Sequence, residues 1–429
     1  MRILLILAHH GIKKKSLFYK FVYTSYYPSL TLDQLAAITP TDHDLEIIDE
    51  RWQNINYGWD GDLVGISSLT YSAQHAYEIA DRFRSKGKTV VLGGYHPSSL
   101  PQEAKKHADS VVVGEAEESW PKLLEDFEQS RLKSFYHSKP VNPEKIPSCE
   151  RISTRFQGVA SIQATRGCPY ECKFCAIQKV EGSTLRMRPI VEVIKEIKSI
   201  RSKRLFFADS SLTINPEYTK TLFKKMKGLK KTFSCYGNIN VLGNDKEILE
   251  LANEAGCELW LIGFESINQE TLHAIGKQTN KVDEYANTVR KIRNHGMRIM
   301  GLFMFGFDTD MPEVFDTTIQ AIYRWKLDKA GFAILTPFPG TKLYSELEKE
   351  GRILTKDWSK YNLKDVVFQP KNMTKEELYE GTKRLVNEFY STTNSLKRSF
   401  RDDHITPHRF VYSVTSDYSA KKLYNVFGL

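Results

Sequence analysis

The most informative stretch of this sequence for both fold and function is Thr165-Arg166-Gly167-Cys168-Pro169-Tyr170-Glu171-Cys172-Lys173-Phe174-Cys175. It places Cys168, Cys172 and Cys175 on one short loop in a C-x3-C-x2-C pattern. Three thiolates so close in sequence can reach three corners of a four-iron cluster, which leaves one iron open to another ligand. Zinc is the alternative, but structural zinc takes four ligands, and no fourth cysteine or histidine follows at a usual spacing. The pattern therefore favours an iron–sulfur cluster with one open corner.

The cysteine loop follows the first of several apolar runs that alternate with helical patterns. The runs cover residues 160–165, 204–209, 232–241, 258–265, 298–307 and 331–338. Between two of them, Val282, Tyr285, Val289 and Ile292 recur at helical spacing, and Gly296 follows as a C-terminal cap. Strands that alternate with helices are typical of a parallel sheet with crossover helices. We therefore expect residues 156–345 to form a partial or full α/β barrel, a partial (β/α)6 barrel in its simplest form.

A second alternating series precedes the barrel. Its apolar runs cover residues 3–8, 45–49, 63–69, 89–94 and 110–115, with helical patterns near residues 72–85 and 120–127. This series predicts a doubly wound α/β domain over residues 1–135. In such open sheets, ligands bind outside the carboxyl ends of the strands. Here those ends carry His10, Ser67, Ser68, Gly93, Gly94, Gly114 and Glu115. Small residues at the strand ends allow a large ligand to approach closely.

Two further regions complete the chain. Residues 136–155 are polar and contain Pro140, Pro143 and Pro147, which is typical of a linker. Residues 346–429 mix helical patterns, such as residues 375–390, with basic and aromatic residues and show no series of strands. We expect a mainly helical C-terminal region, which could cover the mouth of the barrel.

Length and composition exclude several classes of protein. The 429 residues are 41% hydrophobic and 26% charged, with a mean hydropathy of -0.42, so a disordered, fibrous or membrane-embedded chain is not expected. The longest apolar stretches, residues 3–8 and 299–307, are far shorter than the roughly 18 residues of a membrane-spanning helix. Residues 1–8 are therefore interpreted as a buried first strand and not as a signal peptide.

Cysteine use and charge bear on location and partners. Six cysteines, three of them in one loop, do not suit a disulfide framework and favour a reducing compartment, with the cytoplasm as the expected location. The net charge of +9 arises from 61 basic and 52 acidic residues, but the basic residues are scattered along the chain. No nucleic-acid-binding motif accompanies them, so no nucleic-acid partner is expected.

The cysteine pattern, with the aromatic Phe174 before the last cysteine, resembles that of the radical S-adenosylmethionine (radical SAM) superfamily. The resemblance implies that Cys168, Cys172 and Cys175 bind a [4Fe-4S] cluster whose remaining iron binds S-adenosylmethionine. In that superfamily an electron from the cluster cleaves a carbon–sulfur bond of S-adenosylmethionine, normally yielding a 5'-deoxyadenosyl radical that abstracts hydrogen from the substrate. The resemblance therefore also implies an electron donor, such as ferredoxin or flavodoxin.

Later strand ends match the same superfamily. Asp209 and Ser210 follow the second strand of the series, Glu265 and Ser266 end the fourth, and Gly301 and Phe303 lie in the fifth. The resemblance implies that these residues, together with Phe174, contact S-adenosylmethionine. Alternative roles remain open, because a glycine in a strand can serve packing and an acid at a strand end can cap a helix.

Most of the chain, roughly residues 1–345, resembles the radical SAM enzymes that carry an N-terminal cobalamin-binding domain. The resembling segments are Gly93-Gly94-Tyr95-His96-Pro97, Val113-Gly114-Glu115-Ala116-Glu117 and Thr336-Pro337-Phe338-Pro339-Gly340-Thr341. The resemblance implies cobalamin at the strand ends of the first domain, next to His10, Ser67, Ser68, Gly93, Gly94, Gly114 and Glu115.

The sequence departs from many cobalamin proteins in one respect. It lacks the string D-x-H-x-x-G that places a histidine under the cobalt, and Asp402-Asp403-His404 is followed by Pro407 where glycine is needed. His10-Gly11, after the first strand, is the nearest match. A domain that retained the α/β shape without the cofactor therefore remains an alternative.

The leading hypothesis is a cobalamin-dependent radical SAM C-methyltransferase that acts on an unactivated carbon. One alternative is a cobalamin-independent radical SAM cyclase, isomerase or carbon–carbon coupling enzyme. The non-enzymatic alternative is a metal-stabilised basic scaffold that binds anionic partners. The substrate class stays open among lipids, tetrapyrroles, peptides and natural-product precursors, and no catalytic residue is assigned.

Overall fold

The computed structural model describes residues 1–9, 29–151, 158–400, 415–422 and 424. Contacts divide the chain into a first unit, Met1–Pro169, Cys175–Ser210 and Phe338–Thr341, and a second unit, Tyr170–Phe174, Ser211–Pro337 and Lys342–Leu429. His10 and the string Asp402-Asp403-His404 with Pro407 lie outside the described residues. The predicted domain boundaries at residues 135, 155 and 345 stay a prediction.

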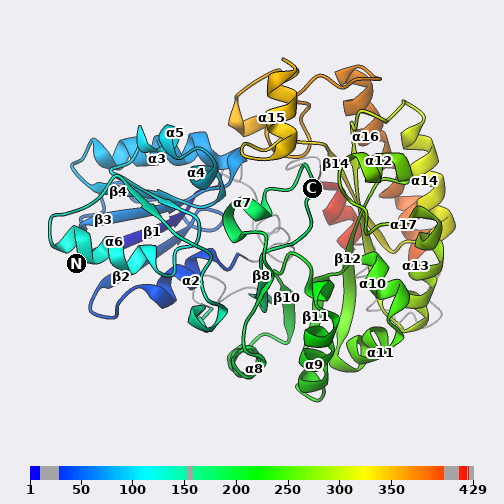
Figure 1. The fold of residues 1–429 in the computed structure, drawn as a ribbon, viewed down its shortest axis with the longest axis horizontal. Coiled ribbons are helices and arrows are strands. Elements are labelled where there is room, and N and C mark those ends of the chain that lie inside the picture. Colours follow the sequence, from blue (N-terminus) through cyan, green and yellow to red (C-terminus); the bar gives the residue numbers. More distant parts are fainter. Residues whose placement is uncertain (10–28, 152–157, 401–414, 423, 425–429) are drawn as a thin grey trace. The chain divides into compact units, whose positions relative to one another are not determined.

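The first unit contains a six-stranded parallel sheet with the strand order β2-β1-β3-β4-β5-β6. Its elements are β1 (Arg2–Leu7), α2 (Thr31–Ile38), β2 (Asp44–Asp49), β3 (Leu63–Ser67), η1 (Thr70–Ser72), α3 (Ala73–Arg84), β4 (Thr89–Gly93), α4 (Tyr95–Ser99), α5 (Pro101–Lys105), β5 (Ser110–Val113), α6 (Ser119–Glu128), β6 (Phe135–His137) and η2 (Pro143–Lys145). Helices α3, α4 and α5 lie on one face of this sheet, and α2 and α6 lie on the other (Figure 1). The order reverses between β1 and β3, which makes the carboxyl ends of these strands the expected ligand site.

The apolar runs form this sheet because its inner strands are buried on both faces, as is usual in a parallel sheet. All residues of β3 are buried, and Ile3, Leu4, Leu5 and Ile6 of β1 are fully buried. The five predicted strands are confirmed to within two residues at each end. The sixth strand, β6, was not predicted, because it is a short edge strand of which only three residues pair with β5, at the start of the proline-containing stretch.

The first unit also contains the beginning of the second strand series. Its remaining elements are β7 (Val159–Ile162), β8 (Thr165–Arg166), α7 (Ile177–Glu181), β9 (Arg186–Met187), α8 (Ile190–Ser199) and β10 (Arg204–Phe207). Strands β7 and β10 pair in parallel, with Ile162 opposite Phe207. The short strands β8 and β9 form an antiparallel ladder, one strand before and one after the cysteine loop. No periodic pattern in the sequence predicted this ladder.

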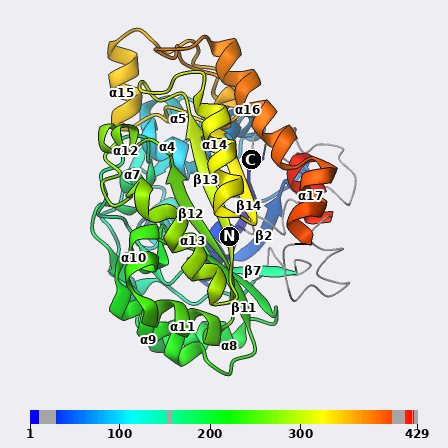
Figure 2. The same ribbon diagram turned by 90° about the vertical axis from the view of Figure 1, so that its right-hand side faces the viewer.

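The second unit continues the series with four parallel strands in the order β14-β13-β12-β11. Its elements are η3 (Leu212–Ile214), α9 (Pro216–Met226), β11 (Thr232–Tyr236), α10 (Ile239–Asn244), α11 (Lys246–Ala255), β12 (Cys257–Glu265), α12 (Gln269–Ala274), η4 (Val282–Glu284), α13 (Tyr285–Asn294), β13 (Arg298–Phe305), α14 (Val314–Trp325) and β14 (Lys329–Ile334). Figure 2 shows helices α13 and α14 covering one face of β12 and β13. The βα units thus follow one another as predicted.

One predicted strand is too long. Residues 232–241 were expected to be a single strand, but β11 ends at Tyr236 and α10 begins at Ile239. The Asn238 side chain accepts a hydrogen bond from the backbone N–H of Asn240 and so caps α10. The apolar residues after Tyr236 therefore belong to a helix, and the asparagine was the signal for its start.

The C-terminal region is helical, as predicted. It contains α15 (Lys342–Lys349), η5 (Trp358–Lys360), α16 (Lys375–Phe389) and α17 (Thr392–Ser399), followed by helical residues 415–422. A capping box fixes the start of α16, because Thr374 and Glu377 bond to each other's backbone N–H groups. Among the described residues, no helix is both long enough and apolar enough to cross a membrane.

Candidate active site

The three cysteines of the loop are half-buried, and none of them forms a disulfide. Cys168 and Cys175 belong to the first unit and Cys172 to the second. Within the described ranges, no three histidine, cysteine, aspartate or glutamate side chains are grouped as ligands of a single metal ion. Thiolates around a four-iron cluster are more widely spaced than ligands of one ion, so the loop is the place to test for a cluster.

Backbone contacts within the first unit hold the start of the loop. Gly167 has a φ of +82°, and a Cβ on it would lie 2.2 Å from the carbonyl oxygen of Thr184, so this position requires glycine. The N–H of Cys168 donates to the carbonyl oxygen of Gly182 at 3.2 Å, and the Gln178 side chain donates to the Cys168 carbonyl at 2.9 Å. The backbone of Cys168 is thus fixed on both sides.

Contacts within the second unit hold the middle of the loop. The N–H of Lys173 donates to the carbonyl oxygen of Ile275 at 3.0 Å, and the carbonyl of Lys173 accepts from Leu343 at 3.0 Å. Phe174, a predicted contact of S-adenosylmethionine, is half-buried next to these fixed residues. The backbone of the loop is therefore held by hydrogen bonds to other parts of the protein, while its three cysteines stay partly exposed.

Asp209 lies at the end of β10 and anchors the segment that leads into the loop. Its carboxylate accepts hydrogen bonds from the N–H and hydroxyl of Thr165, at 2.5 and 2.7 Å, and from the N–H of Ala164 at 3.1 Å. The residue is 2% exposed, and burial raises the pKa of its carboxyl to about 6. The structure thus gives Asp209 a positioning role before Cys168, and its predicted contact with S-adenosylmethionine stays a prediction.

We expect Asp209 to make folding pH-dependent. A carboxyl whose pKa is raised in the folded state stabilises the fold below its unfolded-state pKa, and this contribution is lost as the pH rises through the folded-state pKa. Relative to Asp209→Asn, the wild type should therefore lose about 3 kcal/mol of unfolding free energy between about pH 4 and 7. Urea unfolding of both proteins across this range measures the difference.

The matched control for this prediction is the exposed Asp42→Asn, which lies in the same unit. The difference in unfolding free energy between this variant and the wild type should change far less with pH. If the difference in unfolding free energy between Asp209→Asn and the wild type did not change with pH, Asp209 would have the same pKa in the folded and unfolded states.

Glu181, at the end of α7, connects the start of the loop with helix α4 of the first unit. Its carboxylate accepts from the N–H of Gly167 at 3.0 Å, the hydroxyl of Tyr95 at 3.3 Å and the hydroxyl of Ser210 at 3.4 Å. Burial raises the pKa of Glu181. Ser210, a predicted contact of S-adenosylmethionine, therefore donates to a glutamate that the sequence did not single out.

The first unit contains a cavity of about 470 Å³ at the carboxyl ends of β1, β3, β4 and β5. Six of the seven predicted cobalamin contacts line it together: Ser67, Ser68, Gly93, Gly94, Gly114 and Glu115. The cavity continues along the sheet, past Leu5, Gly65 and Val91, towards α2 and α6. His10, the seventh predicted contact, lies outside the described residues.

Glycines give this cavity its depth. A Cβ on Gly65 would lie 2.9 Å from the Leu5 side chain, and one on Gly94, whose φ is +98°, would lie 2.7 Å from the carbonyl oxygen of Ser68. A Cβ on Gly93 would meet only Val112, at an ordinary 3.7 Å. Gly93 thus leaves open a volume that a side chain could fill. Such a cradle suits a large ligand that approaches the backbone closely.

A buried network of charges forms one side of the cavity. Glu115 forms an ion pair with Arg186 at 2.7 Å and accepts from the N–H of Val141 at 2.6 Å, and Glu117 pairs with Arg166 at 2.6 Å. Glu115, a predicted cobalamin contact, therefore has a structural role in the wall. The two arginines lie far from Glu115 in sequence, so sequence patterns could not reveal these pairs.

The remaining predicted contacts of S-adenosylmethionine lie in the second unit. Glu265 has a φ of 62°, which is uncommon for a residue other than glycine. Its carboxylate pairs with Lys277 at 2.9 Å. The hydroxyl of Ser266 accepts from the N–H of Asn268 at 3.1 Å, which fixes the turn after β12.

Gly301 and Phe303 face the helices that cover β13. The Phe303 ring stacks on Phe264 at 5.3 Å, and Phe264 in turn contacts Tyr285 of α13 and Trp325 of α14. The structure thus places both residues in a packed aromatic core. The opposite face of the sheet carries half-exposed small and flexible residues, which the sequence did not single out: Ser234, Tyr236, Gly263, Met300, Leu302, Met304, Gly331 and Ala333.

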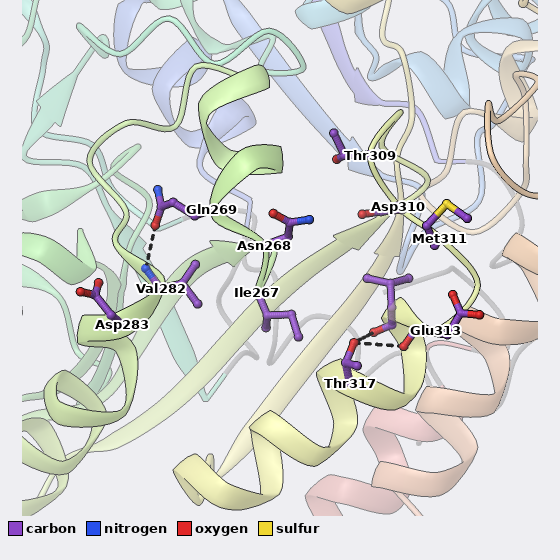
Figure 3. Close-up of a pocket in the computed structure, with 11 residues that line it drawn as sticks. Ile267, Asn268, Gln269, Val282, Asp283, Thr309, Asp310, Met311, Glu313 and Thr317 are labelled. Atoms are coloured by element: carbon purple, nitrogen blue, oxygen red, sulfur yellow. Dashed lines mark hydrogen bonds between the residues drawn. The ribbon is translucent and has the colours of Figure 1, made fainter.

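A second cavity, of about 790 Å³, lies beyond the carboxyl ends of β12 and β13 in the second unit (Figure 3). Ile267, Asn268 and Gln269 line it on one side, and Thr309 to Met311 line it on another. The Gln269 side chain accepts from the N–H of Val282, and the Asp310 carboxylate accepts from the N–H groups of Gly306 and Phe307. None of the predicted site residues lines this cavity.

Comparisons with protein families agree with this architecture. The family model of the radical SAM superfamily matches residues 162–322, and that of the B12-binding domain matches residues 32–124. A domain of unknown function matches residues 341–427. The fold and the cysteine loop thus define a radical SAM protein with an N-terminal B12-binding domain.

Two curated relatives indicate which kind of radical SAM enzyme this is. The bacteriochlorophyllide d C-8(2)-methyltransferase of Chlorobaculum tepidum is 38% identical over 79% of this chain and 80% of its own length. The bacteriochlorophyllide d C-12(1)-methyltransferase of the same organism is 33% identical over 86% and 84%. The chain therefore belongs to the cobalamin-dependent radical SAM methyltransferases. Its cofactors are a [4Fe-4S] cluster, S-adenosylmethionine and cobalamin, and it uses an electron donor.

Solved structures share the fold over the whole chain. The radical SAM methyltransferase TsrM of Kitasatospora setae, with cobalamin and a [4Fe-4S] cluster bound, has a TM-score of 0.71 at 14% identity and covers all of both chains. The cobalamin-dependent radical enzyme OxsB has a TM-score of 0.71 at 14% identity, covering 98% of this chain and 71% of its own. The predicted fold class is confirmed.

Proposed function

We propose that this protein transfers a methyl group to a carbon atom on the periphery of a tetrapyrrole of the bacteriochlorophyllide type. The observation that carries the proposal is the 38% and 33% identity to two methyltransferases that are named for bacteriochlorophyllide d. Both relatives are matched over at least 79% of this chain and at least 80% of their own length, so the similarity extends over most of both proteins.

In this proposal the thiolates of Cys168, Cys172 and Cys175 hold the cluster. Thiolate is the donor that iron–sulfur clusters prefer, and the backbone bonds of Cys168 and Lys173 fix the loop without using the thiols. When bound, the cluster supplies the electron that cleaves S-adenosylmethionine, and cobalamin supplies the methyl group. Asp209 and Glu181 position the segment before Cys168 through their hydrogen bonds to Thr165 and Gly167.

The cavity of the first unit holds cobalamin in this proposal. Its glycines allow the large ring to approach the backbone, and its continuation along the sheet past Gly65 accommodates a long substituent. The pairs of Glu115 with Arg186 and of Glu117 with Arg166 keep the wall charge-balanced. The residues that contact the ring stay a prediction from this shape.

The half-exposed face of β13 and β14 suits a flat, apolar substrate. Met300, Leu302 and Met304 lie on one strand, and Gly331 and Ala333 on the next, where a Cβ on Gly331 would lie 2.9 Å from the Leu302 side chain. Small residues beside flexible thioethers leave an even apolar surface. Glu265 and Lys277 supply polar contacts for S-adenosylmethionine in the same unit.

The experiment offers the reconstituted, reduced enzyme two substrates, bacteriochlorophyllide d and a hopanoid lipid, with S-adenosylmethionine that carries a trideuterated methyl group. We expect the tetrapyrrole to gain the labelled methyl group and the lipid to stay unchanged, as measured by mass spectrometry. Labelling of the lipid alone, or of neither compound, would overturn the tetrapyrrole assignment.

The electron donor is proposed to be a ferredoxin or a flavodoxin, because the cluster accepts one electron at a time. The cytoplasm is the proposed location, and the support for it is the cysteine pattern of the sequence. No nucleic-acid partner is proposed.

A further inference from the structure

The middle of the cysteine loop contacts the first helix of the C-terminal region. Residues 341–427 match a domain of unknown function, and α15 (Lys342–Lys349) is its first helix. The N–H of Leu343, the second residue of α15, donates to the carbonyl oxygen of Lys173 at 3.0 Å. An N–H in the first turn of a helix has no acceptor within that helix. The cysteine loop therefore supplies the acceptor that α15 needs at this position.

Two ion pairs flank this hydrogen bond. Lys342 of α15 pairs with Glu171 of the loop at 2.9 Å, and Glu346 of α15 pairs with Lys173 of the loop at 3.3 Å. Each side of the contact thus contributes one acid and one base. In sequence, Glu171 and Lys173 are the direct neighbours of Cys172, and all of these residues belong to the second unit. Both neighbours of Cys172 are therefore bonded to α15.

The end of α12 holds the same part of the loop. The N–H of Lys173 donates to the carbonyl oxygen of Ile275, directly after α12, at 3.0 Å. Gly276 has a φ of +77°, and a Cβ on it would lie 2.8 Å from the carbonyl oxygen of Glu171, so the loop approaches closely here. The N–H of Lys173 thus bonds to the end of α12 and its carbonyl to α15. Cys168 is held by contacts of the first unit, so Cys172 has a separate support.

We propose that α15, and with it the domain of unknown function, positions Cys172 for binding of the cluster. The inference rests on the proposed function, because it takes the three cysteines of the loop to be the cluster ligands. Lys342, Leu343 and Glu346 are positioning residues: they hold the backbone on both sides of Cys172 and leave its thiolate to iron. A metal site needs such neighbours, because they keep its ligands close to the binding geometry.

The expected effect on the cluster is moderate, because the four paired side chains are between 40% and 72% exposed. An exposed ion pair changes an equilibrium by about fivefold at most. Loss of one pair therefore leaves the protein folded and loosens the segment that carries Cys172. The time for which the protein retains its cluster should show this change.

The test measures how fast the reconstituted protein loses its cluster to an excess of a ferrous-iron chelator, followed anaerobically by the visible absorbance. Lys342→Glu and Glu171→Lys each place like charges opposite one another. Each variant should therefore lose the cluster about 2- to 5-fold faster than the wild type. The double variant Lys342→Glu/Glu171→Lys has opposite charges again and should retain the cluster nearly as long as the wild type.

The matched control is Lys356→Glu. It breaks the pair that Lys356 forms at 2.7 Å with Glu348 of the same helix, a pair that includes no residue of the loop. Without the cluster, this variant should shift its urea midpoint about as much as Lys342→Glu does. With the cluster, it should lose iron at the wild-type rate.

Wild-type rates of cluster loss in both single variants would overturn the role of α15. Equal acceleration in Lys356→Glu would also overturn it, because the effect would then come from the stability of the helix alone. The same holds if the double variant does not recover, because the pair would then not be the cause. Methylation of the tetrapyrrole together with unchanged cluster loss would leave the proposed function intact and remove only this inference. The expected rates of cluster loss without tetrapyrrole methylation would do the reverse.

Discussion

Replacement of Cys168, Cys172 or Cys175 by alanine should abolish both the cluster and the activity of the enzyme. Each thiolate is one of three that the cluster needs, so each alanine variant leaves one further iron without a protein ligand. After anaerobic reconstitution, the wild type should contain about four irons per chain and each variant fewer than about one. Methyl transfer should fall to the enzyme-free background.

The matched control is Cys257→Ala. Cys257 begins β12, is 5% exposed and behaves as a small apolar core residue. This variant should keep its iron and its activity. If Cys172→Ala retained four irons and full turnover, the loop would not be the cluster site, and the function assigned to it would fall.

Gly93→Phe should weaken cobalamin binding about 5- to 150-fold while leaving the cluster intact. The glycine lines the cavity, and the backbone at this position tolerates a Cβ, so the new ring would occupy space that the ligand needs. Overpacking of this kind costs roughly 1–3 kcal/mol, which corresponds to about 5- to 150-fold weaker binding. Equilibrium titration with hydroxocobalamin, followed by its visible absorbance, measures the loss.

Gly93→Ala is the control for this prediction. Its methyl group would lie 3.7 Å from the Val112 side chain, an ordinary contact, so the fold should be unchanged and binding should weaken much less. Iron content should equal that of the wild type in both variants. If Gly93→Phe bound cobalamin as tightly as the wild type, the cofactor would have to lie elsewhere in the protein.

The inner strands of the first sheet could be predicted because a strand that is buried on both faces is a continuous apolar run in the sequence. The run at residues 63–69, for example, predicted β3 (Leu63–Ser67). Strand β6 could not be predicted in this way, because it is an edge strand of three residues that pairs with β5 alone. The ladder of β8 and β9 has two residues in each strand and carries no periodicity.

The predictions for the candidate site rest on features that are local in sequence. The type and spacing of Cys168, Cys172 and Cys175 alone predict that they bind a cluster, and Gly93-Gly94 was predicted as a ligand contact because it directly follows a strand. Both features depend only on chain neighbours. They need no information on which distant segments meet.

Roles that depend on distant segments were not predictable. Glu115 follows a strand and was expected to contact cobalamin, but its partner Arg186 lies 71 residues away. Gly301 and Phe303 alternate correctly for one face of β13, yet only the position of α13 and α14 decides which face meets the helices. Glu181 could have been found only through its three hydrogen-bond donors.

The central claim is that this chain is a cobalamin-dependent radical SAM methyltransferase. If one S-adenosylmethionine supplies the methyl group and a second supplies the radical, the two by-products S-adenosylhomocysteine and 5'-deoxyadenosine should form together, and their ratio during turnover on the proposed tetrapyrrole substrate is the most direct test. We predict equal amounts of the two products, with one methyl group gained per pair. Formation of 5'-deoxyadenosine without S-adenosylhomocysteine would contradict the claim and indicate radical chemistry without methyl transfer.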